Sequence, residues 1–166
     1  MSVQPIFLDM KTINNFAETV AEKLKFYAGG DLNFIVEKLG GNVHYLNIDD
    51  WFKNGDGKIK VKDKKFDIFV SNFFGPYRTR FTIAHELGHY FLHSLAGAKD
   101  IEKERLGSDR LETEANWFAA GFLMPKKIFL EHKKICDDVG YLAGIFNVSN
   151  SAVNYRIKNL ERLKRE

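Results

Sequence analysis

Two histidines and a glutamate are the side chains in this sequence best suited to chemistry. They are His85, Glu86 and His89, within the segment RFTIAHELGHYFLH. Residues four positions apart on a helix lie one above the other, so both imidazoles can face a single Zn²⁺ ion. Glu86 lies beside them and can take a proton from the attacking water as a general base. The pattern therefore predicts a metal-dependent hydrolase.

Chance is a poor explanation of this pattern, because a chain of this composition should contain it only about 0.01 times. The alternative is that both histidines are core residues of an amphipathic helix, which the flanking apolar residues would also allow. Two imidazoles and a carboxylate buried in one turn would be costly without a partner, and a metal ion supplies one. We therefore expect metal binding.

A third protein ligand must come from elsewhere, since a catalytic zinc ion usually has three. We expect it in the downstream segment LETEANWFAAGFLMP, where Glu112 and Asn116 lie on a second helix. Their spacing lets Glu112 bind the metal while Asn116 orients another ligand. Glu114 is the competing carboxylate, although it projects from a different side of that helix. His93, two turns beyond His85, is expected to orient a ligand, contact substrate or lie at the surface.

Together, RFTIAHELGHYFLH and the pattern ExEANxFAAxFLMP, from Glu112 to Pro125, resemble the ImmA/IrrE metallopeptidases of bacteria and their mobile elements. The resemblance implies a glutamate-zincin that cleaves a helix-turn-helix repressor and so releases its target genes. It implies His85, His89 and Glu112 as ligands of one zinc ion and Glu86 as the base. Mn²⁺ or Fe²⁺ could replace Zn²⁺, because availability as well as affinity decides which metal fills such a site.

Peptide hydrolysis also needs a donor for the negative charge that develops on the carbonyl oxygen. The sequence leaves several candidates open: Tyr77, Arg78, Arg80, Tyr90 and His132. Of these, Tyr77, Arg80 and Tyr90 are expected beside the ligands or the substrate. The strand from Phe66 to Ser71 is expected to offer an edge to an extended substrate segment, with a purely structural strand as the alternative.

Elements before the motif are predicted from apolar periodicity and turn residues. Helices are expected over residues 13–24 and 31–39, each followed by a glycine pair. A strand should cover 42–46 and lead into a loop around 49–51. Residues 58–71 alternate in two runs joined by a polar turn at 63–65, which predicts a hairpin.

Elements from the motif onward are predicted to be helical. The helix that carries the histidines should run from residue 79 to about 95, and the charged segment 98–110 should form a mobile connection or lid. The helix that carries Glu112 should cover 111–123 and end before Pro125. The expected class is α+β, mostly helical with a small antiparallel or mixed sheet.

The segment from Tyr141 to Leu160 has the rhythm of a helix-turn-helix, with Ser149 as a helix cap. A DNA reader of this kind would expose Asn150, Ser151, Asn154, Tyr155 and Lys158 to bases and Arg156 to phosphates. The same unit often only packs against a neighbour. We therefore expect protein recognition or structural support ahead of DNA binding.

Length and composition set the remaining limits. With 166 residues, we expect one zincin-like metallopeptidase domain over residues 1–130 and a helical extension over 131–166 packed on it. The single cysteine fits a reducing compartment, and no apolar run is long enough for a signal peptide or a membrane span, so the cytoplasm is the expected location. The formal charge of +3 is concentrated in the last residues, as a solvated helix would explain.

Two functions from different classes follow from these patterns. The first is a zinc endopeptidase that cleaves a helix-turn-helix repressor. The second is a non-proteolytic regulator that binds a repressor or DNA and carries a structural or idle metal site. The substitution Glu86→Gln separates them, because only the peptidase loses its function while still binding zinc.

Overall fold

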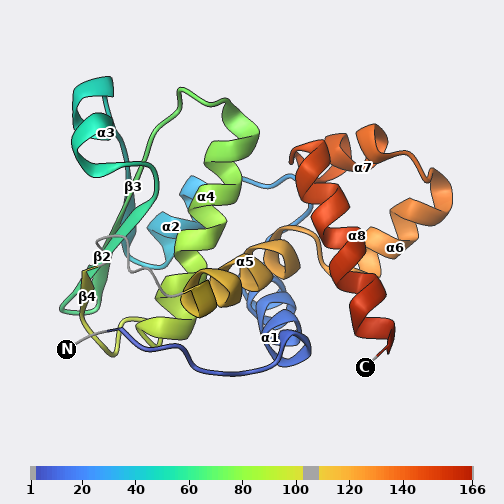
Figure 1. Cartoon of the computed structure of the whole chain (residues 1–166), viewed down its shortest axis with the longest axis horizontal. Coiled ribbons are helices and arrows are strands. Elements are labelled where there is room, and N and C mark those ends of the chain that lie inside the picture. The colour runs from blue at the N-terminus through green and yellow to red at the C-terminus, as the bar shows by residue number, and fades with distance from the viewer. Residues whose placement is uncertain (1–2, 103–108, 166) are drawn as a thin grey trace.

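The computed structural model describes residues 3–102 and 109–165 and confirms the α+β class. Figure 1 shows the sheet at one side of the molecule, the last three helices at the other, and α4 and α5 between them. The helices in the described ranges are α1 Met10–Lys23, α2 Leu32–Lys38, α3 Ile48–Asn54, α4 Pro76–Gly88, the π-helical turn η1 His89–His93, α5 Asp109–Leu123, α6 Lys126–Ile135, α7 Val139–Phe146 and α8 Asn150–Arg165. None of these helices has the length and apolar character that crossing a membrane requires.

The small sheet is mixed, and its described strands follow the order β1-β3-β2-β4. The strands are β1 Gly41–Tyr45, β2 Lys58–Lys62, β3 Lys65–Val70 and β4 Ile101–Glu102. Strand β1 is parallel to β3, whereas β2 is antiparallel to both of its neighbours. The hairpin prediction is confirmed, with Asp63 and Lys64 forming a tight turn at positive φ. The expectation that residues 66–71 offer a free edge is wrong, because β3 is hydrogen-bonded on both sides.

Two further expectations need correction. A helix, α3, occupies the position where a loop was expected around residues 49–51. Asn47 caps its N-terminus, and the Asn47 side chain accepts a hydrogen bond from the Asp50 N–H. The connection expected over residues 98–110 contains the short strand β4, which pairs with Lys60 and Val61. The rest of that expectation, residues 103–108, lies outside the described residues.

Three helices form the packed layer that carries the motif. Helix α5 lies against α1 on one side and α4 on the other. Its buried apolar face includes Phe118 and Phe122, and the Phe118 ring stacks on Phe91 with 5.5 Å between centroids. Close packing of large apolar side chains allows little adjustment. The chemistry-bearing residues of α4 and α5 are therefore held in a fixed relationship.

The C-terminal segment contains the expected helix-turn-helix. Asn147 follows helix α7 as its C-cap in the left-handed conformation. Ser149 Oγ accepts a hydrogen bond from the Ala152 N–H at 3.1 Å, which confirms the predicted helix cap. The expectation that Arg156 faces DNA phosphates is wrong, since this residue is 1% exposed. Its guanidinium instead donates to Met124 O, Asn14 Oδ1 and Glu18 Oε1.

Candidate metal centre

The two histidines of the motif lie on the inner side of α4 and its π-helical continuation. His85 belongs to α4, while His89 is the first residue of η1 and is fully buried. Their Nε2 atoms lie 3.1 Å apart. Two imidazoles at this spacing direct their ε nitrogens at one common point, as expected for residues four positions apart.

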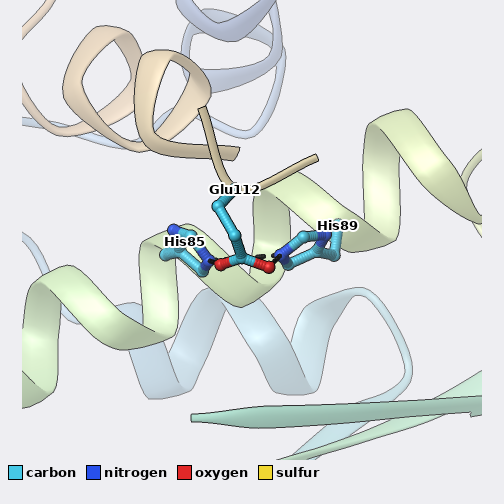
Figure 2. A group of neighbouring side chains, drawn as sticks. All are labelled: His85, His89 and Glu112. Atoms are coloured by element: carbon cyan, nitrogen blue, oxygen red, sulfur yellow. Dashed lines mark hydrogen bonds and ion pairs between the residues drawn. The ribbon is translucent and has the colours of Figure 1, made fainter. Parts of the chain in front are cut away.

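Glu112 comes from α5 and completes the group. Its Oε2 lies 2.9 Å from His85 Nε2, and its Oε1 lies 3.7 Å from His89 Nε2. Figure 2 shows the carboxylate between the two imidazole rings, reaching down from α5 while both histidines project from the helix below. The ligand atoms of these three side chains all lie within 4.8 Å of one another.

This donor set fits a metal ion. In tetrahedral coordination with bonds of about 2.0–2.1 Å, two ligand atoms are separated by about 3.4 Å. The observed separations of 2.9, 3.1 and 3.7 Å lie on both sides of that value. Two imidazoles and one carboxylate are also a typical protein ligand set for catalytic zinc. His85, His89 and Glu112 could therefore hold such an ion and leave a coordination position open.

A glycine allows α5 to come close enough to α4. A Cβ atom at Gly88 would lie 3.0 Å from the Ala115 Cα and 3.1 Å from its carbonyl oxygen. Those neighbours are backbone atoms, which cannot move aside without displacing α5. Gly88 thus permits the helix contact that brings Glu112 to the histidines.

Asn116 contacts the far nitrogen of His85. Its Oδ1 lies 2.8 Å from His85 Nδ1. An amide oxygen only accepts hydrogen bonds, so His85 donates through Nδ1–H and its Nε2 keeps the lone pair that a metal needs. The structure thus brings Asn116 to the place where the sequence predicted an orienting residue.

His93 lies behind His89 rather than two turns along the same face. The π-helical turn adds residues to the turn, so the Nδ1 atoms of His89 and His93 come within 2.8 Å. The Nε2 of His93 lies 2.9 Å from Glu114 Oε2, and neither of these two side chains is exposed. Glu114 therefore faces His93, on the side of α5 away from the three grouped ligand atoms.

Glu86 is buried in the same turn of α4, with 2% of its surface exposed. Gly57, in the loop before β2, lies beside the Glu86 carboxylate. A Cβ atom added at Gly57 would lie 3.0 Å from Glu86 Oε1. Gly57 thereby leaves space for the carboxylate. In this position Glu86 is a neighbour of His85 that solvent barely reaches.

The remaining predicted residues are dispersed. Tyr77 is half-exposed and lines a cavity that Asn116 also borders. Arg80 is buried away from the histidines, donates to Gly30 O and lies over the Phe26 ring, and burial lowers the pKa of its guanidinium. Tyr90 stacks on a core phenylalanine, and burial raises its pKa. Of the other two candidates, Arg78 lines the same cavity and pairs with Asp56, whereas His132 contacts Tyr141.

The cavity beside Asn116 has a volume of about 480 Å³ and contains residues that the sequence did not assign to the site. Besides the predicted Tyr77 and Arg78, helix α4 contributes Phe81 and Thr82, and the start of α8 contributes Ser151 and Tyr155. The last two are four residues apart and therefore share one face of α8. That spacing was visible in the sequence, but nothing in it indicated that this face would lie opposite α4.

Comparison with known proteins agrees with this arrangement. Residues 36–158 match the family model described as the IrrE N-terminal-like domain. The chain is 32% identical over 84 residues to the metallopeptidase ImmA of Bacillus subtilis. The aligned region covers 49% of this chain and 50% of that protein. It is 33% identical over 107 residues to an immunity region protein of Bacillus phage phi105, covering 62% and 64% respectively. The matched regions thus span only half to two thirds of these relatives.

A solved structure shares the fold. The Mycobacterium tuberculosis transcriptional regulator superposes with a TM-score of 0.62 and 21% sequence identity, covering 87% of this chain and 46% of that one. At this identity the likeness concerns the fold alone. Since the family model covers most of the chain, and both halves of the histidine and glutamate group lie within it, the chain belongs to the ImmA/IrrE family of metallopeptidases.

Proposed function

We propose that the chain is a zinc-dependent endopeptidase in which His85, His89 and Glu112 hold the metal and Glu86 transfers the proton. The observation that carries the proposal is the convergence of the three ligand atoms from two separate helices. When bound there, Zn²⁺ would polarise the scissile carbonyl and make water a stronger nucleophile near neutral pH.

In this proposal Glu86 performs the acid and base steps. Its carboxylate takes a proton from the attacking water and later gives it to the leaving amine. Because Glu86 is 2% exposed, few solvent molecules compete for that proton. Gly57 supports this role, since any larger residue there would press on the carboxylate.

The cavity between α4 and α8 is proposed to receive a substrate side chain. Asn116 connects it to His85, so a residue bound there would lie close to the reacting centre. Aromatic rings of Phe81 and Tyr155 line it, and Ser151 and Thr82 add hydroxyl groups. A pocket of this composition favours a large, mainly apolar side chain.

The substrate is proposed to be a helix-turn-helix repressor, whose cleavage would relieve repression. Support comes from the sequence resemblance and from the relatives, one named a metallopeptidase and the other an immunity region protein of a phage. Direct DNA binding by α8 has less support. Ser151 and Tyr155, expected to read bases, line the cavity opposite α4, and Arg156 is buried.

The domain division is also a proposal, with a peptidase domain over residues 1–130 and an extension over 131–166. The buried Arg156 supports an extension that is packed tightly on the domain, because it bonds to Asn14 and Glu18 of α1. Tyr155 would then act as part of the substrate pocket while its neighbour anchors the extension.

The test is metal content combined with cleavage. Wild type, Glu86→Gln and the surface control Glu102→Gln are purified, their bound zinc is measured, and each is incubated with the repressor encoded nearest its gene. We expect about one zinc per chain in all three and cleavage by wild type and the control only. Cleavage by Glu86→Gln, or a wild type that binds no zinc when zinc is supplied, would contradict the proposal.

A further inference from the structure

A chain of buried polar contacts runs away from the candidate metal centre behind His89. His89 Nδ1 lies 2.8 Å from His93 Nδ1, and His93 Nε2 lies 2.9 Å from Glu114 Oε2. His93 and Glu114 have fully buried side chains. Burying an imidazole and a carboxylate together is costly unless each is well hydrogen-bonded, so their placement one step from His89 needs an explanation.

Both oxygens of Glu114 are occupied by donors. Oε1 accepts from the Phe7 N–H and from Arg110 Nε–H, each at 2.9 Å. Oε2 accepts from the Ile6 N–H at 3.1 Å and from His93. Because a carboxylate has about four lone-pair positions, this arrangement uses all of them for accepting hydrogen bonds. Glu114 can therefore only accept, and His93 must place its proton on Nε2.

This requirement determines the tautomers along the chain of contacts. With its proton on Nε2, a neutral His93 presents a lone pair at Nδ1. The neighbouring His89 then donates through Nδ1–H, which leaves the lone pair of His89 at Nε2. That atom is the one facing His85 and Glu112. The orientation of His89 as a ligand thus follows from an acidic residue two contacts away.

We infer that His93 and Glu114 are positioning residues, which hold His89 as the Nδ1–H tautomer with Nε2 directed at the metal. The inference rests on the proposed metal site. It gives the two histidine ligands different supports, an amide oxygen for His85 and an imidazole backed by a carboxylate for His89. It also connects the metal centre to the segment before α1, whose backbone N–H groups at Ile6 and Phe7 hold Glu114 in place.

The competing explanation is that the His93–Glu114 pair only stabilises the fold. A double-mutant cycle in zinc affinity separates the two. Zinc dissociation constants are measured by chelator competition for wild type, His93→Gln, Glu114→Gln, the double variant and the control Glu102→Gln. Loss of an outer partner of a ligand typically weakens metal binding 10–100-fold, so we expect about that loss in each single variant.

The cycle also predicts how the losses combine. If Glu114 acts through His93, replacing Glu114 in the His93→Gln background should change the dissociation constant by no more than about twofold. Two results would overturn the inference: a double variant whose loss of zinc affinity is the product of the two single losses, or a Glu114→Gln protein that binds zinc within about twofold of wild type. Glu102→Gln should bind like wild type, because the ion pairs of the exposed Glu102 within the described part of the chain go to Lys58 and Lys60 of β2.

A second measurement needs no variant and covers the case in which Glu114→Gln does not fold. Nitrogen-15 NMR of the zinc-loaded wild-type chain reports which ring nitrogen of each histidine carries a proton. We expect Nδ1–H for His89 and a proton on Nε2 alone for His93, whereas any proton on His93 Nδ1 would overturn the inference, because that nitrogen could then not accept from His89. A wild-type chain that binds no zinc contradicts the proposed function itself. Normal zinc binding with the wrong tautomers contradicts only the positioning role.

Discussion

Asn116 Oδ1 lies 2.8 Å from His85 Nδ1, across the contact between α5 and α4. The same helix α5 therefore supplies both a ligand, Glu112, and the residue that orients another ligand. We expect Asn116→Ala to weaken zinc binding about 10–100-fold, because His85 loses the acceptor that selects its tautomer. Asn116→Asp retains an acceptor at the same place and should recover most of the affinity. Equal zinc affinity of Asn116→Ala and wild type in chelator competition would contradict this role.

The close approach of the two helices at Gly88 leads to a paired prediction. We expect Gly88→Ala to destabilise the protein by about 1–3 kcal/mol, since the added Cβ meets the Ala115 backbone. It should also weaken zinc binding, because α5 carries Glu112 away as it shifts. Gly144→Ala in α7 is the control, with nothing within 4 Å of the new Cβ.

That control should gain about 0.5–1 kcal/mol from the helix propensity of alanine. Chemical denaturation of the metal-free proteins gives both free energies of unfolding. A neutral Gly88→Ala would show that the helices have room to separate.

The buried guanidinium of Arg156 predicts a strong effect of its partner. Burial lowers the pKa of Arg156 to about 10, while Glu18 opposes that shift. Replacing Glu18 with alanine leaves the buried cation without its carboxylate, so we expect a loss of about 3–5 kcal/mol in the free energy of unfolding. The exposed Glu22 on the same helix provides the control, and Glu22→Ala should change stability by less than about 0.5 kcal/mol.

A further comparison isolates the charge. The double variant Glu18→Ala/Arg156→Met contains neither ion and should be more stable than Glu18→Ala, because no uncompensated cation remains in the interior. Denaturant titration checks the order of the two variants. If the double variant is the less stable one, packing around Arg156 outweighs its charge.

The cavity between α4 and α8 predicts a change in cleavage without a change in metal binding. Tyr155→Ala removes an aromatic wall, and we expect kcat/KM for the protein substrate to fall about 10–100-fold. Zinc affinity should stay the same, because Tyr155 contacts none of the three ligands in the described hydrogen-bond network. Tyr155→Phe keeps the ring and should cleave nearly as well as wild type. Unchanged cleavage by Tyr155→Ala would place the substrate elsewhere.

Local sequence patterns predicted much of the fold. Helices α1, α2 and α5 and the β2–β3 hairpin lie within a few residues of their predicted ranges, because apolar periodicity, caps and turn residues act over short stretches of chain. The pairing of β1 with β3 and the central place of β3 did not follow from these patterns. Strand order depends on contacts between distant segments, and β3 carries no local mark of a central position.

The sequence by itself determined which residues could form a metal centre. A spacing of four residues on a helix put His85 with His89 and Glu112 with Asn116, since a helix brings such positions to one face. Only the tertiary structure decided how these two helices meet and what lies behind the ligands. The π-helical turn brings His93 into contact with His89, and the packing of α5 places Glu114 against His93. The start of α8 lies at the cavity beside Asn116. Helix phase and interhelical approach depend on close packing across the whole core, which no short stretch of sequence encodes.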